Sequence, residues 1–492
     1  MLSAVDPADM RRLAIRRPSP FIVREAPLLA VLALYALVVV ATLPQQLVQD
    51  SWLALVAGRE IVEHGLPRTE TLTVWAQGTP WVDQQWLAQL GLYGLVSLGG
   101  LKLLMVFHAG LLITALGSAL FAARSLGGGP RSVAMVALVG MLAAPWALQL
   151  RAQSFAPLLF VWVLYLLAAD SRQPSRRVLL VLPLLALWAN VHGTAALGAL
   201  LALLAGLTSL ARHDRRRAPG VPRRAIVLML SPALLLASPY SLELPGYYRH
   251  MLADSTLSRF VDEWRPSEPA ARTALFYLLA LATVWIVARH GRRLTLFEQL
   301  ALLVTGVAGL AAIRSISWFA LTTIVLLPVA LEGTAARTPW LRADRIRPAL
   351  GLLALCAVLG SAAFALERPG SWFTSRWPTA AAQAVGTAAG SPSTRVFADD
   401  AHADWLLWEL PDLRGRIAYD VRFELLSRGQ LDRLLAYENR IGEGWRRAAA
   451  GYAVLTVDLR ANPTLWPAML ARSNSRIIYR GNGLGVFARR PT

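Results

Sequence analysis

Residues 26–65 read APLLAVLALYALVVVATLPQQLVQDSWLALVAGREIVEHG, an apolar run that passes into an amphipathic segment. The run 27–44 carries no charge and has the length that a helix needs to cross a bilayer. Asp50 follows this run, and residues 52–62 then place their apolar side chains along one face of a helix. We therefore expect a membrane span, an acid at its exit, and a second helix that lies in the membrane interface.

Apolar runs of this kind recur along most of the chain. With 55% hydrophobic and only 16% charged residues among 492, the composition excludes a water-soluble globule. We expect a polytopic α-helical membrane protein with about eleven transmembrane helices of roughly 17–25 residues each. The expected spans are 27–44, 101–123, 132–148, 154–169, 178–191, 194–210, 225–239, 273–288, 295–312, 316–331 and 348–366. The short segment 178–191 leaves open a single helix that is broken at Gly193.

Basic residues concentrate in every second connection between these spans. The basic stretches are RRLAIRRPSP (11–20), SRQPSRR (171–177), RHDRRRAPGVPRR (212–224), RHGRR (289–293) and RTPWLRADRIR (337–347). The net charge of +19 therefore reflects the positive-inside bias of membrane proteins, and it does not predict a nucleic-acid partner. This bias predicts a cytoplasmic N-terminus, and an odd number of spans then places the tail outside.

The chain divides into three parts. Residues 1–26 are expected to be a cytoplasmic basic arm, and residues 27–367 a transmembrane domain with external loops 45–100 and 240–271. After residue 368 short apolar runs alternate with helical patterns, as in RVFADDAHADWLLWEL (395–410). This alternation predicts a small extracytoplasmic α/β domain over 368–492 with a largely parallel sheet.

Polar residues that are unusual for their apolar surroundings gather on the expected external side. They are Asp50, Asp83, Arg151, Asn190, His192, Tyr240, Arg249, Glu263 and Arg314. Arginine is disfavoured at the external end of a membrane span, so its presence there needs a reason. Its guanidinium fork fits phosphate oxygens. We therefore interpret this set as the candidate site.

Most of these residues also have a simpler explanation. Asp50 could cap the N-terminus of the helix that follows it. Arg151 and Arg314 could snorkel to lipid phosphates, and Trp81 and Trp86 could belong to an aromatic belt instead of lining a groove for a lipid-linked substrate. Asn190 and His192 could be helix-end hydrogen-bonding groups, and the residues alone leave these alternatives open.

Six stretches, in order along the chain, resemble the polytopic C-type (GT-C) membrane glycosyltransferases, and within them a bacterial subset. These stretches are DSWLALVAGREIVEHGLPRTETLTVWAQGTPWVDQQWL (50–87), LRAQSF (150–155), LWANVHGTAALG (187–198), SPYSLELPGYY (238–248), FVDEW (260–264) and RIAYDVRFELL (416–426). The resemblance implies a bacterial plasma-membrane enzyme that takes a sugar from a polyprenyl-phosphate donor, with inversion, on the extracytoplasmic face. The acceptor would be a glycan, a lipid or a protein.

The resemblance also implies roles for particular residues. Asp50 matches the acid of the first external loop that acts as catalytic base, with Asp83 as a second catalytic candidate. Arg151, Arg314 and Arg249 would bind the phosphate, and the substrate would also meet His192, Asn190, Trp81, Trp86, Tyr240 and Glu263. The chain departs from its relatives at Ala54, where they often carry His, at Glu70, where they carry Asp, and at Ser51, which replaces the second acid of a double-acid motif.

These departures bear on cofactor and function. No metal ligand and no cofactor is assigned, and the resemblance leaves a divalent metal open. Two alternatives to an enzyme also stay open: a non-catalytic binder of lipid-linked glycan, and a flippase or transporter of a lipidic substrate. A transporter needs polar groups along a path through the membrane, whereas the polar residues of this chain collect at one side.

Overall fold

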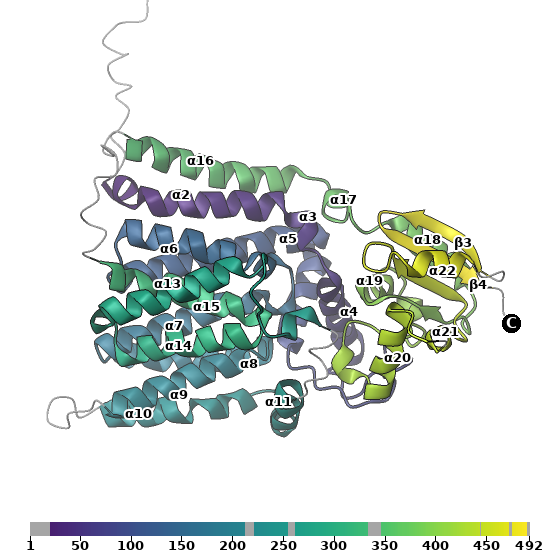
Figure 1. Ribbon diagram of the computed structural model, residues 1–492, viewed down its shortest axis with the longest axis horizontal. Coiled ribbons are helices and arrows are strands. Elements are labelled where there is room, and N and C mark those ends of the chain that lie inside the picture. Colours follow the sequence, from purple (N-terminus) through teal and green to yellow (C-terminus); the bar gives the residue numbers. More distant parts are fainter. Residues whose placement is uncertain are drawn as a thin grey trace, which may run out of the picture.

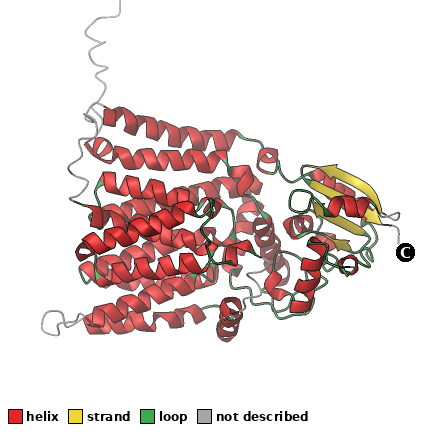
Figure 2. Cartoon of the chain, in the orientation of Figure 1, coloured by secondary structure: helices red, strands yellow, loops and turns green. Residues whose placement is uncertain are grey.

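A computed structural model describes residues 20–211, 221–253, 261–332, 346–442, 444–471 and 475–489. The expected basic arm 1–26 lies outside these ranges except for its last residues, and so does segment 254–260 of the second external loop. The described chain forms a bundle of helices, and a small domain that contains the only described sheet lies at one end of the bundle (Figures 1 and 2).

Each expected span contains a helix. The bundle helices are α2 (Pro20–Ala41), α5 (Trp86–Ser125), α6 (Pro130–Ala143), α7 (Ala156–Arg172), α8 (Val181–Val191), α9 (Ala195–Ala211), α10 (Val221–Leu230), α13 (Ala274–His290), α14 (Leu296–Ala311), α15 (Ile316–Leu331) and α16 (Ile346–Glu367). Six helices in the described residues are long and apolar enough to cross a membrane by themselves, or seven if one bent pair counts as a span. The chain is a multi-pass membrane protein, and eleven as the number of spans remains a prediction.

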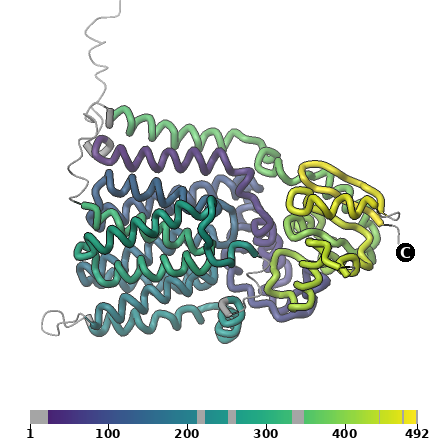
Figure 3. The backbone as a smooth tube through the Cα atoms, in the orientation of Figure 1, coloured from purple at the N-terminus to yellow at the C-terminus, as the bar shows by residue number. Residues whose placement is uncertain are grey.

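Two details of the bundle follow from local sequence. Helices α8 and α9 are separate, because residues 192–194 leave the helical conformation between them. Helix α15 is apolar on all sides, as expected of a helix surrounded by protein, and nearly all of its side chains are buried. Helices α2 and α16, far apart in sequence, lie side by side at one edge of the bundle (Figure 3).

The short helix α3 (Leu43–Gln46) and helix α4 (Gln49–His64) follow the first span. The prediction that residues 52–62 lie in the lipid interface is wrong. Helix α4 packs against α5 and against α19 (Asp400–Glu409) of the C-terminal domain, and Trp52 is fully buried with its ring 5.3 Å from that of Trp377. The C-terminal domain therefore covers the apolar face that sequence alone assigned to lipid.

The C-terminal domain combines short helices with a four-stranded sheet of order β1-β2-β4-β3. Its further helices are α17 (Gly370–Phe373), α18 (Thr379–Ala388), α20 (Arg428–Glu438), α21 (Trp445–Ala448) and α22 (Leu465–Leu470), and its strands are β1 (Val396–Phe397), β2 (Val454–Asp458), β3 (Ser475–Gly481) and β4 (Leu484–Arg489). The α/β prediction is confirmed, but the prediction of a largely parallel sheet is wrong: among the four described strands β1 and β2 pair in parallel, whereas β4 pairs antiparallel with both β2 and β3. Asn482 and Gly483, both at positive φ, turn the chain between β3 and β4, so these strands form an antiparallel hairpin.

The first external loop extends this sheet. Val74 N–H donates to the carbonyl of Ile417 at 2.8 Å, and Trp75 N–H donates to that of Ala418 at 2.9 Å. Ile417 in turn forms a bridge to Val396 of β1. Ile417 and Ala418 of the C-terminal domain thus join this loop to the sheet.

Candidate functional site

Arg151 joins two carboxylates that lie far apart in sequence. Its Nε is 3.0 Å from Oδ2 of Asp50, and its two terminal nitrogens each donate to one oxygen of Glu263 at 2.7 Å. The two parallel hydrogen bonds fix Glu263 against the guanidinium of Arg151, whereas Asp50 is held by charge at the ion-pair distance. All three side chains keep between 21% and 30% of their surface exposed, so a substrate can reach them.

Local structure explains how Asp50 reaches Arg151. The capping interpretation is wrong, because Val48 occupies the cap position and Asp50 is the second residue of α4. Ser51 fixes this turn: its hydroxyl accepts from the N–H of Val48 at 3.0 Å and donates to the carbonyl of Leu150. Ser51 thus ties the start of α4 to the segment that carries Arg151.

Arg314 provides a second cation beside this group. Its guanidinium lies 4.4 Å from the ring centroid of Trp264, the neighbour of Glu263. None of the described carboxylates forms an ion pair with Arg314, so its charge is available to an incoming anion. Burial of Glu263 opposes ionisation, but hydrogen bonds and charge from Arg151, with the charge of Arg314, hold the pKa of Glu263 below its usual range.

His192 lies close to both arginines. It is buried, and its Nδ1 accepts from the N–H of Thr194 at 3.1 Å. Burial, together with the charges of Arg314 and Arg151, lowers the pKa of His192 to about 3. The imidazole is therefore neutral at physiological pH and does not add a third positive charge to the site.

An apolar cavity of about 110 Å³ runs between helices and ends at these charged groups. Its walls include Leu112 and Leu116 of α5, Met141 of α6, and Leu321 and Ile324 of α15. Its polar end includes Arg151, Glu263 and Arg314. The lining thus combines apolar side chains with two arginines, a polarity that suits an amphiphile with an apolar chain and an anionic head.

Asp83 does not join the Asp50 group. It is buried, with one carboxylate oxygen accepting from the amide of Gln89 at 2.9 Å. Burial raises the pKa of Asp83 to about 7, although hydrogen bonds and the charge of Arg422 oppose the shift. The structure thus places this second catalytic candidate on the loop before α5, where the charge of Arg422 of the C-terminal domain acts on it.

The other predicted residues mostly tie elements together. Trp86 donates to the side chain of Asn190 at 2.9 Å, and the hydroxyl of Tyr240 donates to the carbonyl of Pro67 at 2.8 Å. Trp81 is buried beneath the guanidinium of Arg422, with 4.3 Å between ring centroid and guanidinium carbon. Arg249 is exposed on α11 (Leu244–Ala253). The interactions of Trp81, Trp86, Asn190 and Tyr240 thus support the packing of the site.

Sequence reasoning missed a buried ion-pair network in the same region. Arg422 pairs with Asp420 and, at 2.5 Å, with Glu70 of the first external loop, and none of the three side chains is more than 3% exposed. The other oxygen of Glu70 accepts from the N–H groups of Leu72 and Thr73 at 2.6 and 2.8 Å. The stretch RIAYDVRFELL held the signal, since acids and an arginine alternate there with apolar residues.

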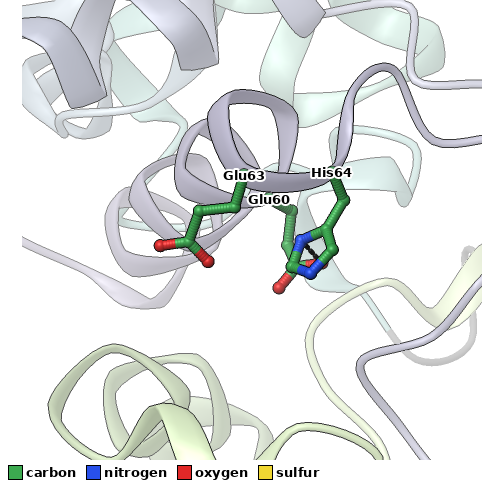
Figure 4. A group of neighbouring side chains, drawn as sticks. All are labelled: Glu60, Glu63 and His64. Carbon is green, nitrogen blue, oxygen red and sulfur yellow. Dashed lines mark ion pairs between the residues drawn. The ribbon is translucent and has the colours of Figure 1, made fainter.

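Two groups of acids bear on the open question of a metal. Glu60, Glu63 and His64 lie together at the C-terminal end of α4 (Figure 4), but Glu60 already pairs with Arg414 at 2.9 Å and with His64 at 3.3 Å. In the Asp50 group, the guanidinium of Arg151 occupies the place between two carboxylates that a cation would need. Neither arrangement fits a metal ion unless these ion pairs rearrange.

The chain matches no family model and no curated protein sequence. Solved structures do resemble it. ArnT from Cupriavidus metallidurans bound to undecaprenyl phosphate has a TM-score of 0.50 at 14% identity, over 93% of this chain and 97% of ArnT. The archaeal oligosaccharyltransferase AglB from Archaeoglobus fulgidus, in complex with an inhibitory peptide and a dolichol-phosphate, has a TM-score of 0.51 at 11% identity, over 93% of this chain and 74% of AglB.

Identities this low establish the fold alone. Both proteins belong to the GT-C superfamily of membrane glycosyltransferases, and the likeness covers the helical bundle together with most of the rest of this chain. The fold expected from the ordered stretches of sequence is confirmed. The chain is therefore a multi-pass membrane protein with the fold of the C-type membrane glycosyltransferases.

Proposed function

We propose that this protein is an integral-membrane glycosyltransferase that moves a sugar from a polyprenyl-phosphate donor to an acceptor hydroxyl, with inversion. The observation that carries the proposal is the apolar cavity that ends at Arg151 and Arg314, with the carboxylate of Asp50 paired to the first of these arginines. The prenyl chain would lie in the cavity and the phosphate at the arginines. Undecaprenyl phosphate in ArnT and dolichol-phosphate in AglB support a ligand of this class.

The ion pairs suggest how the donor prepares the site. Asp50 and Glu263 share Arg151 in the absence of donor, whereas a phosphate offers the same fork a further pair of oxygens. As the phosphate engages Arg151 and Arg314, Asp50 loses part of its hold on Arg151 and can serve as general base. Donor binding would thus free the base that the next step requires.

In the transfer step the acceptor oxygen bonds to the anomeric carbon. The bond from that carbon to the phosphate oxygen breaks, and its electron pair stays on the phosphate. The hydroxyl proton passes to Asp50. Arg151 and Arg314 stabilise the charge on the leaving phosphate, so no protonating acid is needed. Neutral His192 beside them leaves this charge balance unchanged.

We propose a bacterial plasma membrane as the location, with the C-terminal domain outside. In a variant with Cys356 replaced by Ser, single cysteines at the exposed positions Arg176 and Asp432 should differ in accessibility. A membrane-impermeant maleimide should label position 432 in intact cells and position 176 only after lysis, because basic loops stay in the cytoplasm. The reverse pattern would overturn the orientation.

Arg314→Lys should weaken binding of undecaprenyl phosphate by about tenfold, because charge-assisted hydrogen bonds of a planar fork are lost while the charge stays. Binding can be measured on purified protein in detergent. Arg265→Lys is the matched control, since the carbonyl of Arg265 accepts from the N–H of Ile313 beside Arg314, whereas its side chain is 49% exposed and pairs with Asp262. Equal affinity in wild type and Arg314→Lys would remove Arg314 from the phosphate site.

The same measurement tests the function as a whole. Lipid extracted from the purified wild-type protein should contain polyprenyl phosphate or its glycosylated form, identified by mass spectrometry. A wild-type protein that neither retains such a lipid nor binds undecaprenyl phosphate would contradict the proposed donor class.

A further inference from the structure

One short turn of the second external loop contacts both arginines at the polar end of the cavity. The turn is η6 (Asp262–Trp264). Both oxygens of Glu263 accept from the terminal nitrogens of Arg151 at 2.7 Å. The ring centroid of Trp264 lies 4.4 Å from the guanidinium carbon of Arg314. Because Arg151, Glu263 and Arg314 all line the cavity, an anion that reaches the two arginines also meets the carboxylate of Glu263.

Backbone hydrogen bonds hold this turn in place. The carbonyl of Arg265 accepts from the N–H of Ile313 at 3.0 Å. The N–H of Ser267 donates to the carbonyl of Leu310, also at 3.0 Å. These bonds attach the segment after η6 to the end of α14 and to the turn that follows α14. Glu263 therefore keeps its place near the arginines when a ligand arrives, and only its side chain is free to adjust.

The charged groups at this end of the cavity balance one another. Among the described residues that line the cavity, Arg151 and Arg314 are the basic ones and Glu263 is the acid. Asp50 adds a second carboxylate, with its Oδ2 3.0 Å from Nε of Arg151. A carboxylate next to a guanidinium is ionised at neutral pH, so two positive charges face two negative ones. The four side chains thus have no surplus positive charge with which to bind a highly charged ligand.

Lipid phosphates differ in the charge that they bring to such a site. A sugar-linked polyprenyl phosphate is a phosphodiester with a single negative charge, whereas a phosphate monoester carries about −1.5 to −2 at pH 7. A diphosphate-linked lipid also carries more than one negative charge. Glu263 repels each additional charge at short range, in a partly buried site where charges interact more strongly than in water. The affinity for a lipid phosphate should therefore fall as its charge rises.

The hydrogen bonds of Arg151 add a geometric limit. Its terminal nitrogens donate to Glu263, and one of them also donates to the side-chain oxygen of Gln149. Phosphate oxygens that bind Arg151 must share these N–H groups with Glu263 or displace its carboxylate. A displaced carboxylate stays beside the ligand without its cation, so both arrangements disfavour a second charged phosphate.

We propose that Glu263 is a specificity-determining residue, which makes the site selective for a lipid phosphodiester with one negative charge and disfavours diphosphate-linked lipids. This inference rests on the proposed glycosyl transfer, and it narrows the donor to a lipid that is joined to its sugar through a single phosphate. The carboxylate acts through its charge and through its hold on Arg151, and it takes no part in breaking the bond to the sugar.

The same charge favours release of the product. During transfer Asp50 gains a proton as the phosphate gains a negative charge, so the total charge of the site does not change. When Asp50 later gives up this proton, a phosphate monoester with a second charge faces two carboxylates. Repulsion by Glu263 and Asp50 then weakens the hold of the arginines on the lipid phosphate.

The proposal is tested by the binding of two synthetic lipids to full-length protein in detergent at pH 8. They are the methyl ester of undecaprenyl phosphate, which is a diester, and undecaprenyl diphosphate. Neither has a sugar, so the comparison does not depend on the sugar of the donor. The wild type should bind the diester at least about tenfold more tightly than the diphosphate. Glu263→Gln should bind the diphosphate about tenfold and the diester about threefold more tightly than wild type, which reduces the preference to about threefold.

Two further variants separate the charge of Glu263 from its packing. Glu263→Asp keeps the charge on a shorter side chain, so it should retain the preference of the wild type. Asp262→Asn removes an acid from the same turn, but this side chain is 62% exposed and pairs with Arg265 at 2.8 Å. Water and salt screen its charge, and the variant should match the wild type. Equal loss of the preference in Glu263→Asp and Glu263→Gln would assign it to local structure and contradict the proposal.

The outcomes also separate this proposal from the proposed function. If the wild type binds both lipids equally, or if Glu263→Gln keeps the wild-type preference, Glu263 does not determine specificity and the polyprenyl-phosphate donor stands. A wild type that prefers the diphosphate would overturn the selectivity and would indicate a diphosphate-linked donor. A wild type that binds neither of these lipids nor undecaprenyl phosphate would overturn both proposals.

Discussion

Asp50→Asn should slow sugar transfer at least about a hundredfold, because a positioned general base contributes roughly 10²–10⁴-fold to rate. Asn keeps the size of the side chain and an oxygen that can accept from Arg151, so the segment around Ser51 and Leu150 should stay in place. What it loses is the capacity to take the hydroxyl proton. Initial rates with undecaprenyl-phosphate-linked sugars measure the effect, at saturating donor.

The ion pair between Asp50 and Arg151 suggests a competing role for Asp50, namely to hold the arginine for the phosphate. In that case Asp50→Asn would mainly change the affinity for undecaprenyl phosphate and leave the rate at saturation near normal. The general-base role predicts the opposite: lipid binding equal to or tighter than wild type, with a large loss in rate. Glu63→Gln, an exposed change on the same helix, should alter neither quantity.

Near-normal transfer by Asp50→Asn would remove Asp50 as the base. Asp83 and Glu263 would then be the next acids to test, although Glu263 is held by both terminal nitrogens of Arg151. Full loss of transfer with full lipid binding in every acid variant, and in the wild type as well, would instead identify a non-catalytic binder of lipid-linked glycan.

The length of the apolar runs and the charge of the loops predicted the helical bundle and the gathering of polar residues at one end of it. Both signals can be read from the composition of short stretches of sequence. They also placed Asp50, Arg151, Glu263 and Arg314 on one side, and the structure brings these four together. The pairing of Arg151 with Glu263, however, joins residues 112 positions apart. No local pattern encodes such a contact, so sequence indicated the participants and the fold determined the partners.

The errors have a common physical origin. Residues 52–62 were assigned to lipid because an amphipathic helix shows only that one face is apolar, and the C-terminal domain supplies the apolar neighbour. The sheet was expected to be largely parallel because strands and helices alternate, whereas the Asn482–Gly483 turn, readable as a hairpin signal, reverses the chain locally. In both cases tertiary packing decides which element lies next to another, and local sequence patterns do not encode this.

Arg422→Met should destabilise the docked C-terminal domain by roughly 3–5 kcal/mol, because it leaves buried carboxylates without their cation. Glu70 and Asp420 would both lose their cationic partner. A third buried acid, Asp404, would remain nearby, and its pKa is already raised by burial and by the charge of Asp420. Thermal unfolding in detergent measures the loss. Limited proteolysis should then cut the external loops that the wild type protects.

A matched control separates this effect from loss of charge in general. Arg414 also ties the C-terminal domain to α4, through Glu60, but its side chain is 39% exposed. Exposed ion pairs contribute about 0–1 kcal/mol, so Arg414→Met should change the unfolding temperature little. Protonation can neutralise the stranded carboxylates, and the destabilisation by Arg422→Met should therefore be smaller at pH 5 than at pH 8. Equal effects of the two substitutions at both pH values would show that the buried network does not hold the domain in place.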